Sequence, residues 1–208
     1  MGFFHKLFNQ CAKPEGFLGK LMIGGMNKNA HVRLADWGMS HLTSISPEEI
    51  VEIGCGGGRN AGALLDKYPD AHVMAIDYSP LSVETTKAYN EDAIAAGRIT
   101  VEQGNVSCLS LEKEHYDLAT AFETVYFWPG LIECFEQVAS VLKPGGLFLI
   151  VNETDGVEKV GKKFEKIIDG MTVYTMEEIE EALKHAGFSG VKTKHHPSKP
   201  WIMVLAKK

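Results

Sequence analysis

The sequence predicts an α/β fold with a doubly wound, seven-stranded sheet and helices on both faces. From Ile50 onward, apolar runs typical of strands alternate with helical segments, which is the rhythm of a parallel sheet. Four glycines stand within residues 54–58, directly after the first apolar run. The last two strands, near 189–194 and 201–206, are joined by a short polar loop with no helix, so we expect an antiparallel hairpin at the C-terminus.

The segment before the sheet, residues 1–45, reads as an N-terminal helical cap, and residues 46–208 read as the domain that carries the sheet. Within the cap, Ala30, Leu34 and Trp37 are apolar positions on one face of a helix.

Another apolar stripe lies at the start of the chain, at Phe3, Phe4, Leu7 and Phe8. We expect it to pack on the domain rather than to contact a partner, because helical apolar stripes are usually buried. No stretch approaches the roughly 20 apolar residues that span a bilayer, so the sequence predicts neither a signal peptide nor a membrane anchor.

The remaining elements follow from the apolar runs and from the residues that begin and end helices. Strands are expected near 50–54, 72–77, 99–103, 117–122, 147–152, 189–194 and 201–206. Helices are expected near 59–68, 80–96, 131–142, 158–168 and 176–186. Ser79 and Pro80 are typical of a helix start, and Gly97 of a helix end. Thr175 and Glu178 have the spacing of a capping box.

Composition favours a compact enzyme. At 208 residues and 45% hydrophobic content, the chain can bury one sizeable core. A net charge of -6 provides no basic face for nucleic acid. The four cysteines show no C-x-x-C spacing, which indicates a reducing cytoplasm and no metal site at these cysteines.

The glycine loop predicts a nucleotide-type site. A strand that runs into glycines presents backbone amides with no side chains in the way of a ligand. Asp77 ends the second apolar run, where its carboxylate can accept hydrogen bonds from both hydroxyls of a ribose. Glu52 would repel a pyrophosphate but suits an ammonium or sulfonium group. The charge pattern therefore favours a cationic nucleoside.

These residues resemble the class I S-adenosylmethionine-dependent methyltransferases, which have a Rossmann-like sheet. The first motif of that family is similar to Val51–Gly58, and its second acid is similar to Asp77. The resemblance continues through 103–106, 116–122 and 142–150, in the order that the family has. It implies S-adenosylmethionine as cofactor, held by Glu52, Gly54, Cys55, Gly56, Gly58, Asp77, Tyr78, Gly104, Asn105, Val106, Phe122 and Glu123.

One position departs from the family pattern. Asn105 stands after the third strand, where relatives often have an aspartate that reaches the adenine amino group. Its amide carbonyl can accept the same hydrogen bond without the charge. The segment after the fourth strand is rich in aromatic residues, and we expect it to form the wall between cofactor and acceptor. For Phe127 and Trp128, packing under the neighbouring helix is an equally good interpretation.

Methyl transfer from a sulfonium needs little chemical assistance, because alignment and exclusion of water lower most of the barrier. If the acceptor is a phenol or an alcohol, a general base helps further. The candidate catalytic residues are His31, Glu123, Tyr126 and Glu153, and each has a structural alternative. No metal site is predicted, because no close acidic cluster with suitable spacing appears in the sequence.

The expected function is direct in-line methyl transfer to a small molecule, as in ubiquinone- and menaquinone-biosynthesis methyltransferases, with no nucleic-acid partner. The sequence leaves open which acceptor is used and whether the protein forms a homodimer. Two alternatives remain. A nicotinamide-dependent oxidoreductase would use a similar glycine loop, and a non-catalytic S-adenosylmethionine-binding protein would use the same site without turnover.

Overall fold

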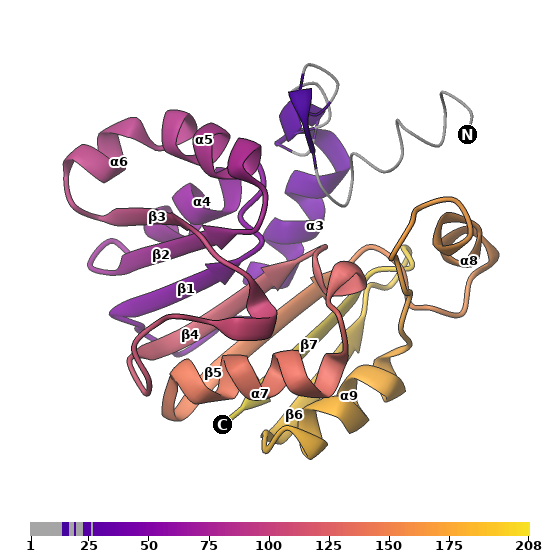
Figure 1. Ribbon diagram of the computed structural model, residues 1–208. Coiled ribbons are helices and arrows are strands. Elements are labelled where there is room, and N and C mark those ends of the chain that lie inside the picture. The colour runs from indigo at the N-terminus through magenta and orange to yellow at the C-terminus, as the bar shows by residue number, and fades with distance from the viewer. Residues whose placement is uncertain (1–13, 17–18, 20–22, 26) are drawn as a thin grey trace.

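A single seven-stranded sheet organises the molecule. The computed structural model describes residues 14–16, 19, 23–25 and 27–208. The strands are β1 (Glu49–Ile53), β2 (His72–Asp77), β3 (Ile99–Gln103), β4 (Tyr116–Phe122), β5 (Leu142–Asn152), β6 (Ser189–His195) and β7 (Ile202–Lys207). They lie in the order β3-β2-β1-β4-β5-β7-β6 (Figure 1). The predicted doubly wound, seven-stranded sheet is therefore confirmed.

Strand direction sets the place of a ligand site. Strands β1 to β5 are parallel to one another, whereas β7 is antiparallel to both β5 and β6. The antiparallel pairing of β6 with β7 was predicted from the missing helix between them. The chain order reverses between β1 and β4. In sheets of this kind, ligands bind beyond the carboxyl ends of the strands at such a reversal.

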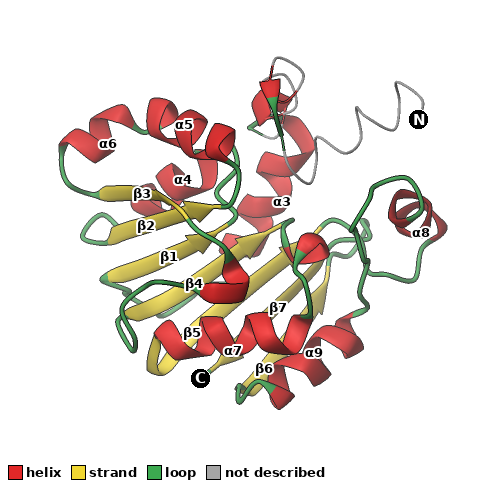
Figure 2. Ribbon diagram, viewed as in Figure 1, coloured by secondary structure: helices red, strands yellow, loops and turns green. Residues whose placement is uncertain are grey.

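Helices cover both faces of the sheet (Figure 2). They are α3 (Asn29–Met39), α4 (Arg59–Lys67), α5 (Pro80–Tyr89), α6 (Glu91–Ala95), α7 (Leu131–Val141), α8 (Lys159–Glu165) and α9 (Met176–His185). One hydrophobic cluster joins α7 and α9 to the sheet, and a second joins α3 and α4 to the other face. In Figure 1, α8 lies off the sheet, beyond the edge where the parallel strands end.

Three elements differ from the expectations. The helix expected at 80–96 is two helices that meet at Asn90, because the Asn90 amide donates its side-chain hydrogen bonds to the carbonyls of Gly58 and Thr86. Strand β5 begins at Leu142 rather than near 147, since Leu142 pairs with Tyr116 ahead of a register shift. The helix expected at 158–168 is limited to the seven residues of α8.

The apolar face of α3 lies only partly against the sheet. Leu34 is buried and Trp37 is half-buried against the same cluster, whereas Ala30 is exposed. Ala35 and Met39 are also buried, so the buried side of the helix is shifted from the face that Ala30, Leu34 and Trp37 share. Gly38 lies on this buried side, and a Cβ there would fall 2.3 Å from a methyl carbon of Val151 on β5.

The core decides one of the open aromatic assignments. Trp128 is 7% exposed and its ring stacks on Phe148, with centroids 6.1 Å apart and planes inclined by 7°. Trp128 is thus a packing residue. Phe127 is half-buried against a small cluster of Tyr126 with residues 168–173.

Some expectations concern parts of the chain that are not described. The apolar stripe at residues 3–8 lies outside the described residues. Among the described residues, no helix has the length and apolar character needed to cross a membrane.

Candidate functional site

The loop after β1 is built for close approach. Gly54, Gly56 and Gly58 have φ angles of 85°, 53° and 81°, a region that residues with a side chain rarely adopt. A Cβ at Gly54 would fall 2.3 Å from the Cγ2 atom of Thr124, which follows β4. The loop and the end of β4 therefore touch without room for one more carbon atom.

Most amides of this loop serve the fold, which corrects the expectation that they face a ligand. The N–H groups of Gly54 and Cys55 donate to the Ile76 carbonyl, that of Gly56 to the Asp77 carboxylate and that of Gly58 to the Cys55 carbonyl, at 2.8–3.0 Å. By contrast, α4 has no side-chain cap at its start, so its first-turn amides are not occupied by a capping side chain.

Asp77 joins the loop to the end of β2. Its two carboxylate oxygens accept hydrogen bonds from the main-chain amides of Gly56 (3.0 Å) and Ser79 (2.9 Å). Burial raises the pKa of Asp77, and these amides act in the opposite direction. Hydrogen bonds from the Ser82 side chain and the Tyr78 amide act in the same direction as these amides, so a ribose would share this carboxylate with donors of the fold.

Glu52 has an unused oxygen in the interior. Its side chain is 1% exposed, and no hydrogen-bond partner for Oε2 exists among the described residues. Thr120, its register partner on β4, likewise has a hydroxyl with no partner in the described part of the chain. Burial raises the pKa of Glu52 well above its usual range, and the neighbouring Asp77 adds to this effect. A buried acid without a partner is costly, and it suits a ligand that brings N–H donors or positive charge.

The residues after β3 lie on the far side of Asp77. The Gly104 amide donates to the Asp77 carbonyl at 3.0 Å, which fixes this segment against β2. Val106 is buried, and Tyr78 is 40% exposed. The side-chain oxygen of Asn105 accepts hydrogen bonds from the Ser107 amide (3.0 Å) and hydroxyl (2.7 Å). The oxygen proposed for adenine is therefore occupied by a local turn.

Three polar side chains that the sequence reasoning missed support the loop from outside. Asn27 donates to the Gly57 carbonyl at 2.8 Å, Thr86 to the Gly56 carbonyl at 3.1 Å and Asn90 to the Gly58 carbonyl at 2.9 Å. Thr86 and Asn90 are spaced by four within or at the end of α5, a pattern that could have indicated one polar helix face. Asn27 has no comparable signal in the sequence.

A second group of polar residues surrounds the ends of β4 and β5. The His31 Nδ1 atom on α3 lies 2.8 and 3.0 Å from the two carboxylate oxygens of Glu123. Glu123 follows the buried Phe122 and adopts a φ of 57°. The Glu123 hydrogen bond raises the pKa of His31.

Tyr126 and Glu153 complete this group. The Tyr126 hydroxyl accepts from the Glu153 main-chain amide at 2.8 Å. Burial raises the pKa of Tyr126 well above its usual range, so it stays a neutral phenol. Burial also raises the pKa of Glu153, as does the neighbouring Glu123. The structure thus brings all four candidate catalytic residues together.

No close acidic cluster was expected from the spacing of residues along the chain, but the fold creates one. Ligand atoms of His31, Glu123 and Glu153 all lie within 4.8 Å of one another. Residues on three separate elements meet here, which explains why spacing along the chain did not reveal the group.

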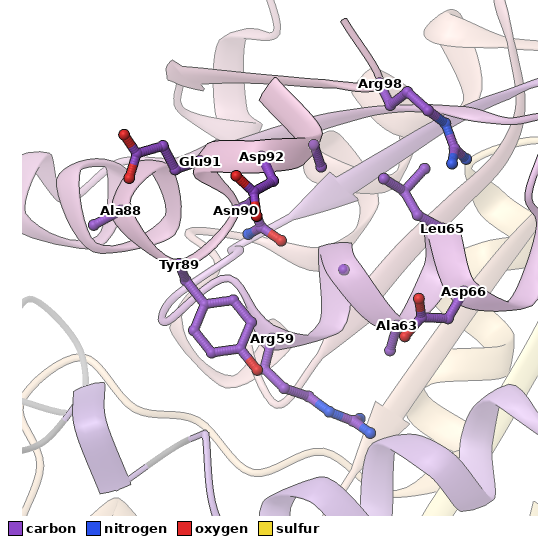
Figure 3. A pocket seen from close by; sticks show the side chains of 12 residues that line it. Arg59, Ala63, Leu65, Asp66, Ala88, Tyr89, Asn90, Glu91, Asp92 and Arg98 are labelled. Carbon is purple, nitrogen blue, oxygen red and sulfur yellow. The ribbon is translucent and has the colours of Figure 1, made fainter. Parts of the chain in front are cut away.

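A hollow of the described surface lies away from these residues. A cavity of about 510 Å³ lies between α4 and the α5–α6 segment, with Arg59, Asp66, Tyr89 and Arg98 in its lining. Figure 3 shows side chains of both charges around it, among them Arg98 and Asp92. It includes none of the predicted site residues.

Comparisons with known proteins agree with this geometry. A family model described as a methyltransferase domain matches residues 50–146. The sterol 24-C-methyltransferase of Candida albicans is 24% identical over 149 residues, which cover 67% of this chain and 39% of that protein. The botryococcene C-methyltransferase of Botryococcus braunii is 25% identical over 206 residues, which cover 91% of this chain and 54% of that protein. The chain thus spans about half of these relatives or less.

Solved structures share the fold. A chain from a complex that contains the Trm112 methyltransferase activator of Haloferax volcanii superposes with a TM-score of 0.82 at 17% identity, covering 100% of this chain and 98% of that one. A Thermotoga maritima protein titled a possible histamine N-methyltransferase gives a TM-score of 0.74 at 17% identity, with 99% of both chains covered. At these identities the likeness concerns the fold alone.

Proposed function

We propose that this chain, as a member of the class I S-adenosylmethionine-dependent methyltransferases, transfers a methyl group directly to a small molecule. The observation that carries the proposal is the buried, unpartnered oxygen of Glu52 beside the glycine loop. A cofactor that carries an ammonium and a sulfonium group supplies what this acid lacks. The names of the relatives, which include sterol and botryococcene C-methyltransferases, support a small-molecule acceptor.

The residues around the loop fit this cofactor in our assignment. Glu52 would face its cationic end, Asp77 its ribose, and the segment at Gly104, Asn105 and Val106 its base. The glycine loop would lie under it, with Cys55, Tyr78, Phe122 and Glu123 beside it. S-adenosylmethionine, when bound, supplies an already activated methyl group. The chain then has to hold the acceptor in line and exclude water.

Three finer points belong to the same proposal. We infer a cytoplasmic location from the unpatterned cysteines. We keep the division into a cap at 1–45 and a sheet domain at 46–208, and we leave a homodimer open. A non-catalytic S-adenosylmethionine-binding protein would use the same site, so binding alone does not establish turnover.

Ligand-dependent stability tests the cofactor assignment. We expect S-adenosylhomocysteine at 100 times its dissociation constant to raise the free energy of unfolding by about 2.7 kcal/mol, because it binds the folded state alone. Chemical denaturation with and without ligand measures this change. NAD at the same concentration is expected to have no effect. Stabilisation by NAD and none by S-adenosylhomocysteine would favour the nicotinamide alternative instead.

A further inference from the structure

The group formed by His31, Glu123 and Glu153 carries an excess of negative charge. It contains two carboxyl groups and one imidazole, all within 4.8 Å. Glu158 acts on Glu153 with the same sign. Among the side chains that the structure describes, neither Glu123 nor Glu153 has a lysine or arginine partner. A carboxylate or phosphate placed here would be repelled, whereas a cation would be attracted.

The orientation of His31 is fixed by Glu123. A carboxylate only accepts hydrogen bonds, so the Nδ1 atom, at 2.8 Å from Glu123 Oε2, must carry the proton. In the neutral ring the lone pair is then on Nε2. The His31 side chain is 39% exposed and that of Glu123 is 19% exposed, so His31 is the more accessible member of the pair. This arrangement suits a general base, His31, whose ring is oriented by the Glu123 carboxylate.

The location of the group connects it with the cofactor site. Glu123 directly follows Phe122 at the end of β4, and Thr124 touches the glycine loop at Gly54. The Thr124 hydroxyl also donates to the Ile53 carbonyl at 3.1 Å. The residue that touches the loop is therefore the direct neighbour of Glu123 in the chain, and an acceptor held by the acidic group would lie next to the cofactor.

We propose that the methyl acceptor is an amine that arrives as an ammonium ion, is held by Glu123 and Glu153 and gives its proton to His31. The inference rests on the proposed function and names its acceptor class. In the step, one N–H bond breaks, the proton goes to Nε2 and the electron pair stays on nitrogen. That pair then forms the bond to the methyl carbon while the carbon–sulfur bond breaks toward sulfur. His31 afterwards loses its proton to water.

Matched ligands test the charge preference. Benzylamine, benzyl alcohol and benzoate share one ring and differ in charge, and each is titrated by calorimetry into the complex with S-adenosylhomocysteine. We expect benzylamine to bind at least about tenfold more tightly than the other two, and Glu153→Gln to weaken it about tenfold, since both carboxylates attract the ammonium. Glu180→Gln, on the exposed side of α9, is the control and should change nothing.

Proton resonances of His31 provide a readout independent of turnover. The bound ammonium should lower the pKa of His31, because a like charge within about 4–6 Å disfavours the protonated ring. Benzyl alcohol should leave it unchanged. Glu123→Gln should lower this pKa in the free protein, since the Glu123 hydrogen bond is the main cause that raises it.

The outcomes separate the two proposals. If S-adenosylhomocysteine does not bind, the proposed function fails. If it binds but benzylamine shows no preference over benzoate, or no effect on His31, only the amine inference fails. Magnesium ion titrated alone is a further arm, because the same three residues include metal-ligating types. If magnesium ions bind there and benzylamine then no longer binds more tightly than benzoate, the inference is also overturned.

Discussion

Asp77→Asn is expected to weaken S-adenosylhomocysteine binding by roughly 30- to 700-fold, which corresponds to about 2–4 kcal/mol for lost charge-assisted hydrogen bonds. The substitution keeps the size of the side chain and one acceptor oxygen, but it places an amide where two ribose hydroxyls would donate. Titration calorimetry on the folded variant measures the change. An affinity equal to that of the original chain would show that the ribose assignment is wrong.

The chain offers a matched control in Asp117. This aspartate also follows the pattern of a carboxylate that accepts main-chain amides, from Glu48 at 3.0 Å and Glu49 at 2.9 Å, and it pairs with Lys143 at 2.7 Å. It lies at the start of β4, at the opposite edge of the sheet. Asp117→Asn is expected to lower stability while leaving ligand affinity unchanged. A loss of affinity in both variants would indicate a general effect of unfolding.

Gly54→Ala is expected to destabilise the protein by about 2–5 kcal/mol. The left-handed backbone costs a residue with a Cβ about 1–2 kcal/mol, and overpacking against Thr124 adds about 1–3 kcal/mol. Thermal unfolding should therefore begin some 4–20 °C lower, at about 2–4 °C per kcal/mol for a chain of this size.

Gly187→Ala isolates the backbone part of this effect. Gly187 has a φ of 90°, but a Cβ there would meet nothing within 4 Å. We expect it to lose only about 1–2 kcal/mol. Thr124→Ala in combination with Gly54→Ala should restore part of the loss, because it removes the clashing methyl group. Equal losses at Gly54 and Gly187 would mean that the contact with Thr124 is unimportant.

Much of the fold could be predicted because it depends on residues that are close together in the sequence. The helix starts at Pro80 and Met176 are set by capping residues that stand next to them, and the structure has both side-chain caps. The break at Asn90 was not readable, because its cause is a hydrogen bond to Gly58, 32 residues away in the sequence. The buried side of α3 could be predicted only in part, because it depends on how Gly38 packs against Val151.

The site divides in the same way. Glu52 and Asp77 stand at the ends of apolar strands, and strand ends of a parallel sheet share one edge, so their proximity could be predicted. The contact of His31 with Glu123 could be suspected only as two separate candidates, because 92 residues separate them. The occupied side-chain oxygen of Asn105 could not be predicted, for another reason. A serine two residues later competes for it, and such local competition depends on the turn that forms.

The buried acid Glu52, at the end of β1, has a thermodynamic consequence for the binding of the cofactor. A carboxyl group whose pKa is raised in the empty protein holds a proton that the unfolded chain would release, so stability falls as pH rises through that pKa. A cationic ligand prefers the ionised form, and its entry should therefore expel a proton into the buffer. Affinity should increase toward alkaline pH until the empty protein has itself lost the proton. Calorimetry in buffers of different ionisation enthalpy would count the protons set free.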